Sequence, residues 1–263
     1  MKNTIKKLAP VMLVLVALAT LSFMAKDGVT LRLKPQQGKT YTVTSKANMM
    51  TMMEVQGQTM NMSQSMETRQ SFEAKEVSDS QSLIETKVEA VKMTISQMGM
   101  KLEYDSEHPD KTSPMLAGQT KQIEETLNNP VTVTYDALGN ILNDSSDTEM
   151  SQLSNVIIEF PKQELTVGST WNTKKTQEVS GTEIVADMVY TVTAISKKSV
   201  DVSFTGTVES EEVSGSYNGT ASINPQTGII MSNTTKSNIS MTINEQGMSI
   251  PITVVGNTTI EVK

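Results

Sequence analysis

Polar and apolar residues alternate with a period of two along most of the chain, a pattern typical of β-strands with one covered face. The longest alternating stretches run from Thr40 to Val55, from Gln58 to Val77 and over residues 82–97. Shorter strands are predicted over residues 29–33, 188–194, 200–204, 239–243 and 248–254. The pattern therefore predicts a mainly β fold built from antiparallel hairpins.

The register of the first hairpin follows from its turn. If Gln56 and Gly57 are the two turn residues, Val55 pairs with Gln58 and Met53 pairs with Met60. One face of the hairpin is then apolar and rich in methionine, and the other is mostly polar. The apolar face holds Ala47, Met49, Met53, Val55, Met60, Met62, Met66, Phe72 and Ala74.

The third long strand changes its apolar phase near Ala90. Apolar residues occupy Ile84 and Val88 before this point, and Val91 and Met93 after it. A slip of one residue predicts a β-bulge, and bulges bend a sheet. We therefore expect a curved sheet with the methionine face on its concave side.

Two short helices are predicted to interrupt the strands. Ser113 is a candidate N-cap followed by Pro114 at the first helical position, and a weaker helix is predicted over residues 147–156. The apolar stripe of the first helix consists of Leu116, Thr120, Ile123 and Leu127. We expect both helices to pack on the concave side, the first as a lid or plug.

Two turn sequences recur along the chain. The stretch 38–41 (GKTY) resembles 168–171 (GSTW), and residues 136–142 resemble 224–230. These recurrences indicate either two repeated halves or common turns that recur by chance. The predicted fold is a long curved antiparallel meander, half-barrel-like, with two short inserted helices. Its predicted parts are a signal peptide at 1–25, an N-terminal β half with an inserted helix at 26–143, a helical connector at 144–164 and a C-terminal β half at 165–263. The two halves are predicted to pack together as one unit.

The first 25 residues have the features of a secretory signal peptide. Lys2, Lys6 and Lys7 precede an apolar run over residues 8–23, which is short for a bilayer span. We predict cleavage between Thr20 and Lys26, and no membrane span in the mature chain. The chain has no cysteine, so we predict an exported, periplasmic or extracellular protein that is not lipid-anchored.

Charge and motifs narrow the classes of function. The net charge is −7 and no basic cluster occurs, which argues against nucleic-acid binding. His108 is the only histidine and lies in a polar loop, and the carboxylates are scattered. No phosphate loop, zinc spacing or dinucleotide fingerprint is present. We predict no catalytic residues, no metal site, no cofactor and no enzymatic activity, and we interpret Trp171 as a core anchor rather than a stacking platform for a ligand.

Methionine is the unusual component of the sequence. Ten of the nineteen methionines fall within residues 49–100. They are interpretable as pliable core filler, as the lining for an apolar ligand, or as thioether ligands for Cu(I). The residues predicted to bind an apolar ligand are Met49, Met53, Met60, Met62, Met66, Phe72, Met93, Leu116, Ile123 and Leu127.

Several short segments resemble a known family. They are residues 31–41 (LRLK…GKTY), 131–142, 160–161, 167–171 and 219–230, together with the leader. They resemble an uncharacterised family of exported β proteins, common in Bacteroidetes, many of them lipoproteins. This chain departs from those members because it lacks the acylated cysteine. The family has no assigned activity, so the resemblance implies no site residues. The meander is also similar, at the level of fold, to the lipoprotein carriers LolA and LolB.

The sequence favours a non-enzymatic exported envelope protein that binds or carries a lipid or other amphiphile on a methionine-lined concave sheet. A structural or interaction protein of the envelope with a filled core is one alternative. A Cu(I)-binding protein is another. The sequence predicts no oligomeric state.

Overall fold

The computed structural model describes residues 28–55, 57–127, 129–144, 156–179, 182–210, 212–245 and 248–263. The predicted signal peptide and all but the last residue of the predicted helix at 147–156 lie outside these ranges.

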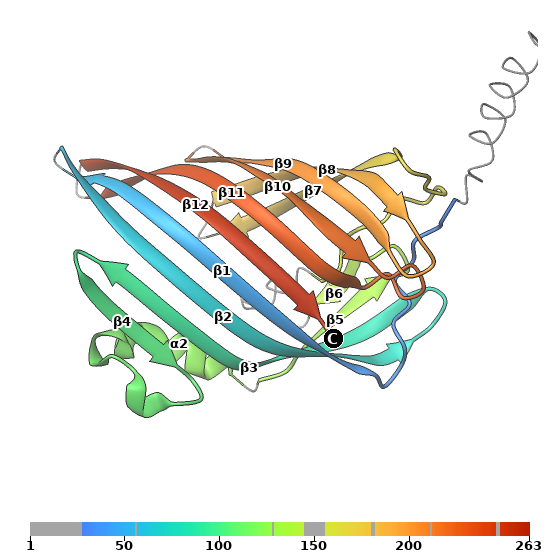
Figure 1. The fold of residues 1–263 in the computed structure, drawn as a ribbon, viewed down its shortest axis with the longest axis horizontal. Coiled ribbons are helices and arrows are strands. Elements are labelled where there is room, and N and C mark those ends of the chain that lie inside the picture. The colour runs from blue at the N-terminus through green and yellow to red at the C-terminus, as the bar shows by residue number, and fades with distance from the viewer. Residues whose placement is uncertain are drawn as a thin grey trace, which may run out of the picture.

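The described residues form one antiparallel sheet of twelve strands that does not close (Figure 1). Its order is β6-β5-β3-β2-β1-β12-β11-β10-β9-β8-β7, and β4 pairs with β3 beside this path. The strands are β1 Thr40–Val55, β2 Gln58–Val77, β3 Gln81–Gln97, β4 Met100–Asp105, β5 Val131–Asp136, β6 Ile141–Asp144, β7 Thr170–Val179, β8 Thr182–Ile195, β9 Val200–Glu209, β10 Val213–Ile223, β11 Ile230–Glu245 and β12 Met248–Val262. In Figure 1, β5, β6 and β7 lie behind β1 and β12, so the sheet curls. The prediction of a mainly β, curved antiparallel fold is confirmed.

The register of the first hairpin is also confirmed. Val55 pairs with Gln58, and Met53 pairs with Met60. The predicted bulge lies in β3, because Arg69 on β2 pairs with Ala90 and its neighbour Gln70 pairs with Val88. The extra residue on β3 shifts the side-chain phase by one, as the sequence pattern indicates.

The N-terminal and C-terminal strands meet at the centre of the sheet. β1 pairs with β12 from Val43–Val262 to Met53–Ile252. The two predicted halves are therefore joined through main-chain hydrogen bonds, and their assignment as two halves of one packed unit stays a prediction.

Two irregular segments fill one end of the concave side. Residues 29–33 form no strand in the sheet, contrary to the prediction from their alternation, and only Val29 forms an isolated bridge, to Leu165. Leu31 and Leu33 are buried instead, because they pack across the ends of the strands together with residues 156–165. Main-chain groups of the crossing segments form hydrogen bonds with turns between strands. The Leu33 backbone N–H, for example, donates to the Ala137 carbonyl (2.9 Å).

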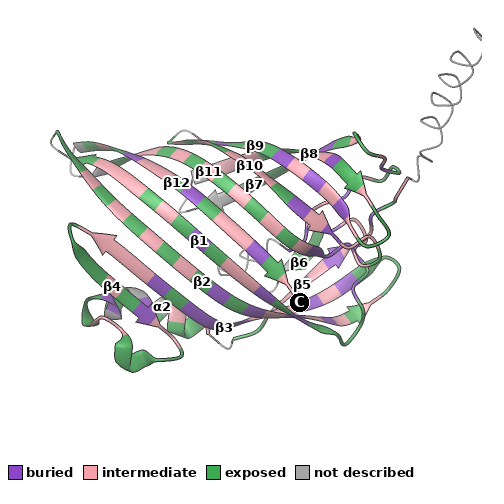
Figure 2. Cartoon of the chain, viewed as in Figure 1, coloured by how far each residue is buried: buried purple, intermediate pink, exposed green. Residues whose placement is uncertain are grey.

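This arrangement places the buried core at one end of the sheet. Figure 2 shows buried residues concentrated along β1, β2 and β12 toward the end where the C-terminus lies. One cluster there centres on Tyr41 and Phe72, whose rings meet edge-on at 5.7 Å. The other centres on Trp171 and Tyr190, whose rings stack at 4.9 Å. We call this end, with the crossing segments, the filled end.

The first predicted helix is present as a 3-10 turn, Pro114–Leu116, followed by α2, Ala117–Thr126. Ser113 does not cap it through its side chain, because its hydroxyl accepts from the Glu103 backbone N–H on β4 (2.9 Å). The residue therefore ties the helix to the sheet. Leu116 is buried against Val88, Val91, Met93 and Tyr104.

Candidate functional site

The inner face of the sheet, which carries Tyr41 and Phe72, divides into two parts. Toward the filled end it is covered by the crossing segments. Toward the β1–β2 and β11–β12 turns it is apolar, and cross-strand pairing aligns its residues in rows: Met60 with Met53, Met53 with Ile252, and Ile252 with Met241. We call this part the open half; it consists of Met49, Thr51, Met53, Met60, Met62, Ile239, Met241, Ile250, Ile252 and Val254.

Side chains of the open half are only partly covered. Most of these side chains are half-buried. The most buried of them, Ile252, is 9% exposed, whereas Phe72 at the filled end is 1% exposed. None of the three buried clusters of the described residues includes a residue of the open half. The open half is therefore an apolar surface on which the described chain stacks no second layer.

The structure separates the predicted site residues into three groups. Met49, Met53, Met60 and Met62 lie on the open half. Five others belong to the cluster beneath α2. Met93 and Leu116 are buried members, and the partly buried Met66, Ile123 and Leu127 pack against the cluster. Phe72 lies in the closed core of the filled end. Sequence periodicity predicts that the methionines of β1 and β2 share one face with Phe72, as their pairing shows, but it does not reveal which part of that face is covered.

A polar band crosses the inner face between the open half and the filled end. Its members are Ser45, Gln64, Thr68, Gln70, Asn233, Thr235, Ser237 and Thr258. Within it the Thr235 hydroxyl donates to Asn233 Oδ1 (3.0 Å), and Gln64 Nε2 lies 3.4 Å from the Met93 sulfur. The band was not predicted, although its signal is visible in the sequence: Thr68 and Gln70 share the phase of Met66 and Phe72.

Tyr217 continues the inner face onto β10, opposite Ser237 on β11 and Gly206 on β9. Burial raises the pKa of its phenol, so the hydroxyl stays neutral at physiological pH. The Met188 side chain occupies the space beside Gly206, where any Cβ would collide with its sulfur. A tyrosine and a methionine thus extend the mixed apolar and hydroxyl character of this face.

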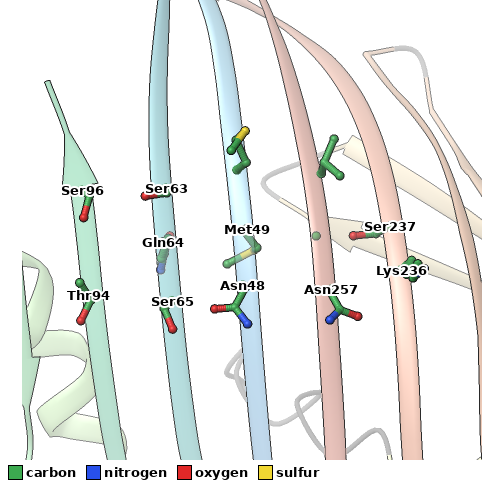
Figure 3. Close-up of a pocket in the computed structure, with 13 residues that line it drawn as sticks. Asn48, Met49, Ser63, Gln64, Ser65, Thr94, Ser96, Lys236, Ser237 and Asn257 are labelled. Carbon is green, nitrogen blue, oxygen red and sulfur yellow. The ribbon is translucent and has the colours of Figure 1, made fainter. Parts of the chain in front are cut away.

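A second concavity lies on the outer face and was not predicted. It is a shallow groove of about 610 Å³ that spans β3, β2, β1, β12 and β11. Figure 3 shows its lining side chains across these neighbouring strands. One row consists of Thr94, Ser65, Asn48, Asn257 and Lys236, and the next consists of Ser96, Ser63, Met50 and Val255. The outer face around it is mostly Ser, Thr and Asn, and the groove combines such polar side chains with the apolar Met50 and Val255.

His108 lies in an exposed ionic cluster. Its Nδ1 is 3.1 Å from Asp105 Oδ2, and Arg69 contacts Glu107 at 2.8 Å. The Arg69 guanidinium holds the pKa of the Glu107 carboxyl below its ordinary value. These contacts fasten the β4 loop to the outer face of β2. In the part of the chain that is described, no group of three or more His, Asp or Glu side chains is arranged to hold a metal ion.

Among the described residues, none of the helices has the length and apolar character needed to cross a bilayer.

No protein-family model matches the chain, so its resemblance to an uncharacterised exported family stays a prediction. No curated protein matches it either. Among solved structures, the chain is similar to one described as lipid–protein interactions in lipovitellin, with a TM-score of 0.54 and 14% identity over 87% of this chain. The chain spans 25% of that lipovitellin chain, and the likeness shows a shared fold. A weaker likeness, with a TM-score of 0.37 and 10% identity, covers 85% of this chain and 88% of the translocator domain of the autotransporter NalP from Neisseria meningitidis.

Proposed function

We propose that the protein binds an amphiphile, such as a lipid, by laying the apolar tail along the open half of the inner face. The observation that carries the proposal is the contrast between the two ends of one face. The filled end buries Phe72 beneath the crossing segments, which contribute Leu31 and Leu33 to its core. The open half presents equally apolar side chains in register, without such a layer among the described residues.

The side chains of the open half suit a ligand of variable shape. Methionine is unbranched and has a polarizable sulfur, so neighbouring methionines adapt to different alkyl chains at low cost. Met53 and Met60 lie directly opposite each other, and Met62 follows on the same face. Burial of such a surface under an alkyl chain is favourable at about 25 cal/mol per Å².

The lipovitellin likeness supports the proposal at the level of fold. Lipovitellin interacts with lipid in the solved structure, and the region matched by this chain has the fold of this sheet. An exported, envelope-located, non-enzymatic carrier is the form of the function that we infer for this chain.

Two other functions are open to the same test. A structural envelope protein would use the methionines as core, as Met93 is used in the cluster beneath α2. A Cu(I)-binding protein would use the Met53–Met60 pair with Met62 as thioether ligands, although thioethers without thiolate or imidazole are modest ligands.

The proposal is tested by titrating the full chain with Nile red, a neutral dye that fluoresces in apolar sites. Met60→Asp places a charge on the open half and should weaken dye binding at least tenfold. Asn61→Asp, one residue away on the exposed outer face, is the matched control and should bind like the wild type.

Unfolding of both variants is followed by circular dichroism to separate binding from stability. Native mass spectrometry of protein from its own cell envelope should show bound lipid. If the wild type binds no dye and carries no lipid while Met60→Asp unfolds, the methionines are core and the structural function replaces this one.

A further inference from the structure

Gln70 is the deepest residue of the polar band. It lies on the inner face of β2, between Val43 on β1 and Val88 on β3. Its side chain is 3% exposed, and its amide oxygen Oε1 accepts no hydrogen bond from any described residue. A buried acceptor without a donor is costly, so such an atom in a folded protein calls for an explanation.

The residues that lead from Gln70 toward the open half are polar but uncharged. Thr68 follows on β2, Ser45 lies opposite Thr68 on β1, and Asn233 lies two strands further on β11. No Lys, Arg, Asp or Glu of the described chain lies on the inner face of β1, β2, β11 or β12 between these residues and Met60. This band can therefore exchange hydrogen bonds with a ligand, but it offers no counter-charge.

An ionised headgroup would be poorly held in these surroundings. A charge that leaves water requires an opposite charge or several donors around it. Exposed acidic residues lie near the outer end of the open half, namely Glu54, Glu209 and Glu212, and they disfavour the approach of an anion.

From these observations, and resting on the proposed function, we infer that the ligand is an amphiphile with an uncharged, hydroxyl-bearing head, such as a monoacylglycerol or a long-chain alcohol. The head lies at the polar band and donates to Gln70, and the tail runs along Met62 and Met60. The stretch of β2 from Thr68 to Met60 is about 26 Å long at about 3.3 Å per residue. An acyl chain that spans one leaflet needs about 15 Å, so the tail fits within this stretch.

The inference is tested by displacing Nile red from the full chain with three ligands that share one oleoyl or oleyl chain. They are monoolein, oleate and oleylamine, compared at pH 8 and equal ionic strength. We expect monoolein to bind at least tenfold more tightly than either ion. Equal or tighter binding of oleate overturns the inference about the head but leaves the proposed function standing. Failure of all three, with no binding of Nile red, overturns both.

A second arm locates the head. Gln70→Leu keeps the size of the side chain and removes the unpaired acceptor, so the unliganded variant should be at least as stable as the wild type. It should bind monoolein at least fivefold more weakly and Nile red unchanged. The control is Ser63→Ala on the outer face of the same strand, which should change neither. If Gln70→Leu binds monoolein like the wild type, the head lies elsewhere and the assignment to Gln70 is wrong.

Discussion

Met53 on β1 and Met60 on β2 are direct cross-strand partners on the inner face. Residues in such positions have Cβ atoms about 5 Å apart, so the two side chains form one continuous surface. The pair continues through Ile252 on β12 to Met241 on β11, which makes a thioether-rich row across four strands. Replacement of its methionines by leucine distinguishes binding of an alkyl chain from binding of a soft metal ion.

Replacing Met49, Met53, Met60 and Met62 together by leucine preserves apolar area and removes every thioether of the first hairpin's open half. Swaps between Met and Leu generally cost less than about 1.5 kcal/mol each. We expect Nile red and monoolein to bind within about threefold of the wild type, measured by fluorescence titration. Anaerobic titration with Cu(I) should show no tight complex in either protein, and a stoichiometric complex lost in the leucine variant would favour copper instead.

Trp171→Phe should lower stability without changing ligand binding. The indole Nε1 donates to the Glu159 backbone carbonyl (2.9 Å), which joins a crossing segment to β7, and the ring stacks on Tyr190. Loss of this donor should cost about 1–3 kcal/mol, measured by urea unfolding with circular dichroism. Asn172→Ala, on the exposed side of the same strand, is the control. A tenfold loss of Nile red affinity would show that Trp171 contacts the ligand.

Gly228→Ala should be far more damaging than Gly38→Ala. Both glycines have a positive φ, 69° and 74°, which costs an alanine about 1–2 kcal/mol. A Cβ at Gly228 would lie 2.3 Å from the Arg32 carbonyl oxygen, whereas a Cβ at Gly38 meets nothing within 4 Å. The difference in stability between the two variants therefore measures how much the packing of residues 29–33 against Gly228 contributes. Equal decreases in the thermal unfolding temperature would show that this contact is unimportant.

The Arg69–Glu107 pair predicts a pH-dependent contribution to stability. The hydrogen bond and charge of Arg69 lower the pKa of Glu107 in the folded protein. A lowered acid pKa gives stability that is present above the unfolded pKa of about 4.3 and is lost as the pH falls through the folded value. The stability difference between wild type and Glu107→Gln should therefore be widest near neutral pH and close below about pH 4.

Urea unfolding at several pH values measures this difference. High salt should reduce it, because the groups are solvent-exposed. The same titration of Glu54→Gln provides a control, since no ion pair involves Glu54 within the described part of the chain. A difference that grows as the pH falls would contradict the assigned direction.

The first hairpin and the bulge near Ala90 were determined by the sequence alone. A two-residue turn at Gln56-Gly57 and a period of two are local signals, and together they specify which residues pair and which face they share. The slip in phase on β3 is equally local. The helix stripe through Leu116 also follows from local spacing, although its Ser113 cap does not, because β4 competes for that hydroxyl.

Only the tertiary structure decided what covers the inner face. Alternation along residues 29–33 is the same for a strand and for a segment that buries Leu31 and Leu33 across strand ends. The choice depends on partners distant in the sequence, such as Leu165 for Val29 and Thr227 for Lys34. Periodicity reports the direction of each side chain but carries no information on what lies above it. For that physical reason, the division into a filled end, a polar band around Gln70 and an open half emerges only when the chain is folded.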